Sequence, residues 1–229
     1  MKLSVLIPTY NEETFILKTL KKVNEQKNKF NLEIIISDDG STDQTISILN
    51  KNQNLFDKLI SNKKNLGKGA ALKIGLTNCS GDIIVIQDAD LEYNPDEYAD
   101  LIDPFLKNEA DIVYGSRFLG NKTKRVLYFK NRIANFFLTL IVNLLTNLNF
   151  TDVETGYKAF RKDILKDIEL KENSFAFEIE FTMKIAKLQK KIYEVGISYN
   201  GRTVEEGKKI KLKDGFFALY SIFKYRFFN

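Results

Sequence analysis

The sequence predicts an α/β protein built on a Rossmann-like, mostly parallel sheet flanked by helices. Three apolar runs of strand length, rich in β-branched residues, lie at 3–8, 32–37 and 82–87. Helical patterns separate these runs, and strands that alternate with helices are typical of parallel sheets. A polar cluster directly follows each run, at the position where open α/β sheets bind ligands.

The elements up to about residue 116 continue this alternation. A helix is expected over 12–27, because Phe15, Leu20 and Val23 recur near one face. Gly40 permits a tight turn after the second strand, and the polar residues that follow it can cap a helix. The other expected elements are a helix at 42–50, a strand at 58–61, a helix at 68–77, a helix opened by Pro95 that runs to about residue 107, and a strand at 110–114.

The second half of the chain is less regular and more amphipathic. Its longest apolar stretch, 133–150, is interrupted by four Asn residues and is too short for a membrane span, which needs about 20 mainly apolar residues. Its composition leaves open whether it is a buried core helix or a helix that lies in a membrane interface. The stretch 216–228 mixes aromatic and basic residues, and it predicts either a membrane-surface helix or a helix packed on the sheet.

The composition bounds the kind of protein and the kind of chemistry. With 229 residues, 44% of them hydrophobic, and no repeat or linker, the chain is expected to form a single domain over 1–229. The chain contains no His, which excludes His-based metal sites, Ser-His-Asp triads and imidazole bases. The single Cys79 excludes an internal disulfide. The N-terminus enters a strand almost at once, which predicts that there is no signal peptide.

The net charge of +5 suits phosphate-bearing substrates or an anionic membrane face. It does not indicate nucleic acid, because the aromatic residues are mostly Phe embedded in apolar runs instead of stacking residues interleaved with Arg. Most Lys residues are expected to form an ordinary solvated surface.

The most specific chemical feature is the pair Asp88 and Asp90 at the end of the strand expected over 82–87. Side chains two residues apart on an extended segment project the same way, so both carboxylates can face one cation or one diphosphate. Oxygen ligands suit Mg²⁺ or Mn²⁺ shared with substrate phosphates. A solvated loop would explain this pair alone, but a second acidic cluster, 38–43, follows the strand at 32–37. The matching placement of two clusters favours a ligand site.

Four motifs, PTYNEE (8–13), DDGSTD (38–43), NLGKGAALKIG (65–75) and DADLEYNP (88–95), resemble those of inverting family-2 glycosyltransferases with the GT-A fold. The resemblance spans nearly the whole chain. Four later stretches are similar to the polyprenyl-phosphate branch, which includes the dolichol-phosphate mannose and glucose synthases: GSR (115–117), TDVETGYKAFRKDIL (151–165), FEIEFTMKIAK (177–187) and SYNGRTVEEGKKIKLKDGF (198–216). The resemblance therefore implies a nucleotide-sugar-binding half at 1–116 and an acceptor-binding half at 117–229.

The resemblance also implies roles on the donor side. Asp90 would ligate the metal directly, Asp88 would contact the ribose or bind the metal through water, and Gln87 would touch the metal or the diphosphate. Lys68 would lie near the diphosphate, Arg202 would close over the donor phosphates, and Glu178 would contact the sugar hydroxyls, although a solvated helix face explains Glu178 equally well. The nucleotide pocket would be completed by Pro8, Tyr10, Glu12, Asp39 and Ala89. Tyr10 would offer its ring to the base and Asp39 a carboxylate to the base edge.

On the acceptor side the resemblance implies Arg117, Arg132 and Asp152. Arg presents paired planar donors that match phosphate oxygens, so Arg117 and Arg132 would bind the acceptor phosphate, unless they are ordinary surface residues. Asp152 would lie near the acceptor. Because a polyprenyl phosphate is already anionic, Asp152 would orient the acceptor or a cation more than accept a proton. The expected catalytic residues are therefore Asp90, Asp152 and Arg117.

The resemblance implies a Mg²⁺- or Mn²⁺-dependent inverting transferase that moves a hexose from GDP-mannose or UDP-glucose to a dolichyl or undecaprenyl phosphate. It would be a peripheral or monotopic protein on the cytoplasmic membrane face. One alternative is a transferase with a saccharide acceptor, for which Asp152 would have to be a true base. A sugar nucleotidyltransferase is less consistent, because 6–13 supplies no N-terminal Gly-rich loop. A non-catalytic binding module is opposed by the intact Asp88 and Asp90.

Overall fold

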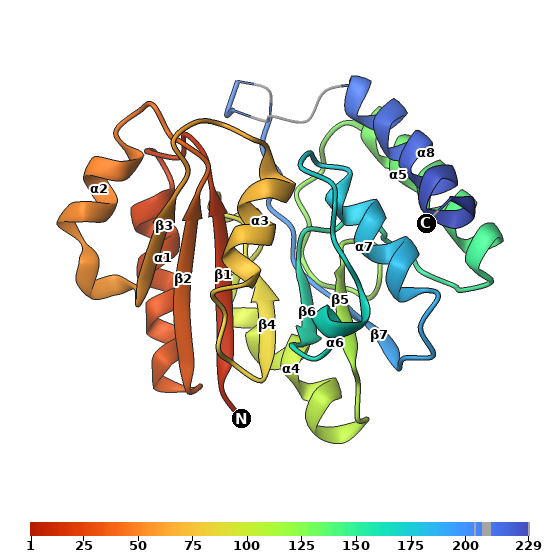
Figure 1. The fold of residues 1–229 in the computed structure, drawn as a ribbon, viewed down its shortest axis with the longest axis horizontal. Coiled ribbons are helices and arrows are strands. Elements are labelled where there is room, and N and C mark those ends of the chain that lie inside the picture. Colours follow the sequence, from red (N-terminus) through yellow and green to blue (C-terminus); the bar gives the residue numbers. More distant parts are fainter. Residues whose placement is uncertain (204, 208–211, 229) are drawn as a thin grey trace.

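The computed structural model describes residues 1–203, 205–207 and 212–228. Its centre is one seven-stranded sheet in the order β3-β2-β1-β4-β6-β5-β7 (Figure 1). The strands are β1 (Leu3–Thr9), β2 (Leu32–Asp38), β3 (Lys58–Ser61), β4 (Ile83–Ile86), β5 (Ile112–Ser116), β6 (Lys158–Arg161) and β7 (Ile192–Gly196). All neighbouring strands pair in parallel except β6, which is antiparallel to both β4 and β5. The expected mostly parallel sheet is confirmed.

The helices cover both faces of this sheet. The longer ones are α1 (Ile16–Glu25), α2 (Thr45–Lys51), α3 (Lys68–Leu76), α4 (Tyr98–Lys107), α5 (Phe129–Thr146), α7 (Phe177–Ile185) and α8 (Leu212–Phe227), and α6 (Ile164–Asp167) is a single turn. Short 3₁₀ turns lie at Gln26–Asn28, Gln53–Leu55 and Pro95–Glu97. In Figure 1, α5 and α8 lie side by side beyond the β7 end of the sheet.

The period-2 pattern of β1 divides the core between the two faces. Val5 and Ile7 pack with the buried residues of α1 and α4. Leu6 points to the other face and packs with Leu72 of α3 and with the buried residues of α7 and α8. Both faces of the central strands are therefore apolar, as expected for parallel strands covered on both sides.

The helix expected over 12–27 begins only at Ile16, because the residues before it bond to the 41–45 loop instead. Asn11 Oδ1 accepts from the Thr42 amide at 2.8 Å, and the Glu12 amide donates to Thr45 Oγ1 at 2.9 Å. Asn11 also has a positive φ of 48°, which a helix excludes. These hydrogen bonds override the helix propensity of residues 12–15, and they hold the loop after β1 against the loop after β2.

The strand expected at 110–114 lies two residues later, at Ile112–Ser116, and strands β6 and β7 were not foreseen. In β6 a charged residue, Lys158, is fully buried, which hides the apolar signature of an interior strand. Part of the 198–216 motif, Val204 and residues 208–211, lies outside the described residues.

Helix α5 covers most of the apolar stretch at 133–150 and has both a buried face and an exposed apolar face. Its inward face carries Asn135 and Thr139, which are buried, whereas Phe136 and Phe137 are 61% and 55% exposed. The described part of α8 is similar, with Phe216, Phe217, Tyr220, Phe227 and other aromatic residues exposed. Among the described residues, no helix combines the length and the apolar character needed to cross a bilayer. Helix α5 therefore packs on the core through Val142, Leu138 and Ile141 and also exposes an aromatic face, so it combines features of the two alternatives that the sequence left open.

Candidate active site

Hydrogen bonds hold the loop after β4 at the carboxyl edge of the sheet. The buried Ala89 carbonyl accepts a hydrogen bond from Thr19 Oγ1 of α1 at 2.7 Å, and Leu91 has a positive φ of 57°. Gln87 is fully buried, where its amide donates to the carbonyls of Asp88 and Tyr93 and accepts from the Tyr98 hydroxyl. Gln87 therefore supports this loop through hydrogen bonds to protein groups, and its contact with a metal or diphosphate stays a prediction.

Arg202 lies among three carboxylates at this edge. It contacts Asp90 through Nη2, pairs with Glu12 Oε2 at 3.1 Å, and lies 3.5 Å from Glu92 Oε1 through Nε. The four side chains are between 8% and 15% exposed, so the contacts are largely shielded from water. Burial, together with the nearby charges of Asp88 and Glu92, raises the pKa of Asp90 to about 7, although Arg202 opposes this shift. The Asp90 side chain therefore has an excess of negative charge around it.

Lys68, the first residue of α3, performs the same role for Asp88. Its Nζ lies 2.8 Å from Asp88 Oδ1 and 3.4 Å from Glu178 Oε1. Burial alone would lower the pKa of Lys68, but the charges of Asp88 and Glu178 outweigh it and raise the pKa above its ordinary value. Glu178 is also in contact with the fully buried Lys158. Glu178 is only 4% exposed, so it does not belong to a solvated helix face.

These residues fit a divalent cation that arrives with a diphosphate. The cations Lys68 and Arg202 contact four carboxylates at this edge, those of Glu12, Asp88, Asp90 and Glu92. The formal charges of this group therefore sum to an excess of two negative charges. Within the described part of the chain no three such side chains already form a metal cluster. Mg²⁺ is commonly held by one or two carboxylates with substrate phosphates supplying the remaining ligands, so Asp88 and Asp90 suffice as protein ligands.

Four of the expected nucleotide-pocket residues lie around the ends of β1 and β2. Pro8 lies within β1, Tyr10 follows it partly buried, and Glu12 is engaged with Arg202. Asp39 is 2% exposed, and its carboxylate accepts hydrogen bonds from Asn62 Nδ2 and from the Leu66 and Gly67 amides. Asp39 therefore holds the loop that leads into α3, and its oxygens are already engaged where a base edge was expected.

Arg117 and Asp152 form the most specific pair of the second half. Arg117 Nε and Nη2 each donate to one carboxylate oxygen of Asp152 at 2.7 Å, and the Arg117 amide donates at 3.0 Å. Asn135 of α5 adds a hydrogen bond at 3.0 Å. Burial alone would raise the pKa of Asp152, but Arg117 and these hydrogen bonds hold it below its usual range. Asp152 is fully buried and both its oxygens are occupied, so it positions Arg117 and has no open oxygen for a proton.

The two expected acceptor-phosphate residues lie against the same ring. The guanidinium groups of Arg117 and Arg132 are centred 5.7 and 5.5 Å from the Phe118 ring centroid. Arg132 is exposed at the start of α5, and the structure shows no ion pair between it and a described residue. Arg117 is 15% exposed and also stacks on Tyr199. The pair presents two cations at the foot of a helix whose outer face is apolar.

Three residues of this region were not foreseen: Glu92, Asn135 and Glu154. Glu92 accepts hydrogen bonds from the Tyr199 hydroxyl and the Arg202 amide, and so anchors the loop that carries Arg202. Asn135 looked like an interruption of an apolar stretch, yet it is the polar link from α5 to Asp152. Glu154 lies in the turn before Gly156. A Cβ added at Gly156 would lie only 2.6 Å from Asp88 Oδ2. The acidic spacing within 151–156 was the available signal for Glu154.

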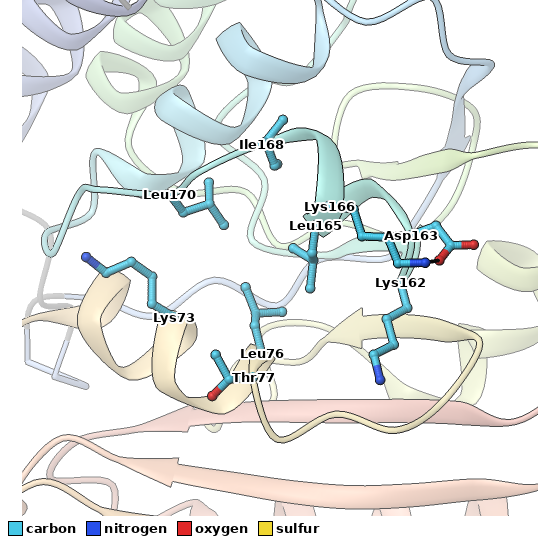
Figure 2. Close-up of a pocket in the computed structure, with 9 residues that line it drawn as sticks. All are labelled: Lys73, Leu76, Thr77, Lys162, Asp163, Leu165, Lys166, Ile168 and Leu170. Carbon is cyan, nitrogen blue, oxygen red and sulfur yellow. Dashed lines mark hydrogen bonds and ion pairs between the residues drawn. The ribbon is translucent and has the colours of Figure 1, made fainter.

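A hollow in the described part of the structure lies apart from these residues (Figure 2). Its volume is about 550 Å³, and it is bordered by the second half of α3 and the segment 162–170. Leu76, Leu165, Ile168 and Leu170 form its apolar part, and Lys73, Lys162 and Lys166 lie at its rim. None of the expected site residues borders it, so the hollow is separate from the site at the carboxyl edge.

Comparison with known proteins agrees with this architecture. Over 219 residues the chain is 30% identical to a dolichol-phosphate mannosyltransferase from Pyrococcus furiosus, and the match covers 92% of this chain but only 61% of that protein. It is 27% identical over 227 residues to a dolichyl-phosphate beta-glucosyltransferase from Trichomonas vaginalis, covering 91% of this chain and 68% of that protein.

Solved structures confirm the expected GT-A fold. Glucosyl-3-phosphoglycerate synthase from Mycobacterium tuberculosis, in complex with Mn²⁺, UDP and phosphoglyceric acid, superposes with a TM-score of 0.75 at 20% identity, covering 100% of this chain and 79% of that one. The same enzyme has been solved with Mg²⁺ and UDP, with a TM-score of 0.74 at 19% identity and coverage of 98% and 79%. The family model described as glycosyl transferase family 2 matches residues 4–169. The chain thus belongs to glycosyl transferase family 2.

Proposed function

We propose that the chain is a Mg²⁺- or Mn²⁺-dependent inverting glycosyltransferase that moves a hexose from a nucleotide sugar to a polyprenyl phosphate. GDP-mannose and UDP-glucose are the donors to test, because the two curated relatives are named as mannosyl- and glucosyltransferases. The proposal treats the chain as a single catalytic unit whose donor residues come mainly from 1–116 and whose acceptor residues come mainly from 117–229.

The observation that carries the acceptor proposal is the pair Arg117 and Arg132 on one Phe118 ring, at the start of α5. Guanidinium groups match phosphate oxygens, and the exposed Phe136 and Phe137 continue the site with an apolar surface. A lipid phosphate combines the anionic head and the apolar tail that these two surfaces fit.

The state of Asp152 favours a phosphate acceptor over a saccharide. A hydroxyl nucleophile must lose its proton, which calls for a general base with an available oxygen. Both oxygens of Asp152 are bonded, and its pKa is held below the usual range. A phosphate oxygen is already anionic and needs no base, so Arg117 and Arg132 only have to orient it.

In the proposed reaction, an oxygen of the acceptor phosphate attacks the anomeric carbon and the nucleoside diphosphate departs from the opposite face. A bound divalent cation supplies Lewis-acid stabilisation of the leaving diphosphate. Asp88 and Asp90 would hold that cation, and Lys68 would add a positive charge beside it. Arg202, now on Asp90 and Glu12, is placed to bind diphosphate oxygens once those carboxylates take another partner.

The test is transfer of radiolabelled sugar from GDP-mannose and from UDP-glucose into an organic-extractable lipid, with polyprenyl phosphate and Mn²⁺ or Mg²⁺. Metal-dependent label that is lost in Asp90→Ala and reduced at least about tenfold in Arg132→Gln supports the proposal. Arg161→Gln, in β6, is the matched arginine control. Label that appears only on a saccharide acceptor would instead support the alternative acceptor.

We also propose that the exposed aromatic faces of α5 and α8 lie on the cytoplasmic surface of a membrane. Burying a Phe side chain contributes about 1.5–3 kcal/mol, so Phe136→Ser with Phe137→Ser should weaken binding to vesicles of anionic lipid at least about tenfold. Leu106→Ser is the control, because Leu106 is 67% exposed on α4, which Figure 1 shows well apart from α5 and α8. Equal vesicle binding by the double variant and the control would refute the proposal.

A further inference from the structure

Tyr199, which follows β7, contacts both the donor part and the acceptor part of the site. Its hydroxyl donates a hydrogen bond to Glu92 Oε2 at 2.8 Å. Its ring lies against Arg117, whose guanidinium carbon is 5.2 Å from the ring centroid. Both charged groups are at most 15% exposed, and shielding from water strengthens each of these contacts. Tyr199 therefore links a carboxylate of the donor side to an arginine of the acceptor side.

The backbone and the ring of Tyr199 are held by further contacts. Its amide donates to the Thr123 carbonyl at 3.1 Å, and its carbonyl accepts from the Arg125 amide at 2.8 Å. The ring also packs against Tyr93, with 5.7 Å between the ring centroids. Because the backbone is fixed and the ring is packed, the hydrogen bond of the hydroxyl decides how firmly the ring is held against Arg117.

Glu92 is shared between this hydroxyl and Arg202. Its Oε1 accepts from the Arg202 amide at 2.7 Å and lies 3.5 Å from Arg202 Nε, which has no hydrogen-bond acceptor among the described residues. In the proposed reaction, the Arg202 guanidinium turns from these carboxylates to the diphosphate. Glu92 then keeps its negative charge without the nearby guanidinium, and a carboxylate whose charge is less compensated accepts a stronger hydrogen bond from Tyr199.

We propose that Tyr199 is a positioning residue that couples the binding of the nucleotide to the binding of the acceptor phosphate. A nucleotide on the donor side strengthens the bond from Tyr199 to Glu92, and the ring, together with Asp152, then holds the Arg117 guanidinium in place for a phosphate oxygen. Binding free energies are reciprocal, so the acceptor phosphate favours the nucleotide by the same factor. This inference rests on the proposed function, because it assigns the residue through which the two substrates of that reaction act on each other.

The test uses Tyr199→Phe, which keeps the ring on Arg117 and removes only the hydroxyl. Tyr193→Phe is the matched control, because the Tyr193 hydroxyl lies 3.5 Å from the Asn108 carbonyl and contacts neither charged group. Binding of geranyl phosphate, a short prenyl phosphate, is measured by calorimetry with Mn²⁺ alone and with Mn²⁺ plus GDP or UDP. In the wild type and in Tyr193→Phe, we expect one of the nucleotides to tighten the binding of geranyl phosphate about fivefold or more.

In Tyr199→Phe this tightening should disappear, whereas the affinity for geranyl phosphate without nucleotide should stay close to that of the wild type. A residue that only anchors its loop would lower the melting temperature and leave the tightening unchanged. Tyr199→Leu, which also removes the ring, should bind geranyl phosphate more weakly with or without nucleotide, because Arg117 loses its stacking partner.

The inference is overturned if Tyr199→Phe keeps the tightening seen in the wild type, or if neither nucleotide tightens binding to the wild type. A different failure separates the proposed function from this inference. If the wild type binds a nucleotide with Mn²⁺ but no geranyl phosphate, the proposed acceptor is wrong and the coupling falls with it. If the wild type binds geranyl phosphate but neither nucleotide, the proposed donors are wrong, and the coupling is again overturned.

Discussion

Arg202→Gln offers the sharpest test of the charge balance in the donor site. Arg202 is the shared cation of Glu12, Asp90 and Glu92, all of them at most 15% exposed. Removing one partner of a buried ion pair typically costs about 3–5 kcal/mol. We expect less here, about 2–4 kcal/mol, because the pKa of Asp90 is already about 7 and the side chain can take up a proton.

The expected loss can be measured as a melting temperature. For a domain of this size, 1 kcal/mol corresponds to about 2–4 °C, so the melting temperature of Arg202→Gln should lie about 4–16 °C below that of the wild type in a chelating buffer. Mn²⁺ should then stabilise the variant more than the wild type, because it no longer competes with a guanidinium for Asp90. At a concentration about 100 times the Kd, a bound ligand adds about 2.7 kcal/mol, which is enough to recover most of the loss.

The assay is thermal denaturation with and without Mn²⁺, supported by calorimetry of Mn²⁺ binding without nucleotide. We expect the Kd for Mn²⁺ to fall roughly tenfold in Arg202→Gln, equivalent to about 1.4 kcal/mol. Arg226→Gln, on the exposed surface of α8, should match the wild type in both measurements. Equal Mn²⁺ stabilisation of the wild type and Arg202→Gln would refute the reasoning that Arg202 stands in for a cation.

Three further predictions concern other parts of the fold. Burial alone would raise the pKa of Glu33, but its hydrogen bonds lower the pKa to about 2 from the ordinary 4.5. The ionised Glu33 therefore stabilises the fold above pH 4.5, and this contribution is lost as the pH falls towards 2. After allowance for solvent screening, Glu33→Gln should lower the free energy of unfolding by roughly 2 kcal/mol at about pH 7 and flatten the acid limb of a urea-denaturation series. Gly156→Ala places a Cβ 2.6 Å from Asp88 Oδ2. Calorimetry should therefore show that the variant binds the Mn²⁺-nucleotide complex about tenfold more weakly, with little change in melting temperature. Unchanged binding would contradict this prediction. Asp152→Asn leaves the buried Arg117 without its counter-ion, and we expect a loss of about 3–5 kcal/mol in chemical denaturation, in contrast to the near-neutral result if the pair were solvated.

The sequence was most informative where local patterns and global fold agree. The runs that became β1, β2 and β4 are apolar and β-branched, and the parallel sheet forced their carboxyl ends, with Asp38 and Asp88, onto one edge. Composition left open whether 133–150 and 216–228 form core or surface helices, and the tertiary structure shows the exposed aromatic faces of α5 and α8. Strand β6 could not be predicted, because the buried Lys158 interrupts its apolar pattern and pairs with Glu178, which lies 20 residues later in α7.

The sequence by itself determined the fold class, the acidic pair at the end of β4 and the arginines suited to phosphates, because these depend on residue type and short-range periodicity. Only the tertiary structure decided which partner each charge has. In the folded chain, Gln87 is buried in the core and Asp39 accepts hydrogen bonds from the loop before α3. Asp152 is bonded to Arg117, and Glu154 Oε1 has no donor among the described residues. The physical reason is that pairing and desolvation depend on distances between residues far apart in the chain, which no local pattern encodes.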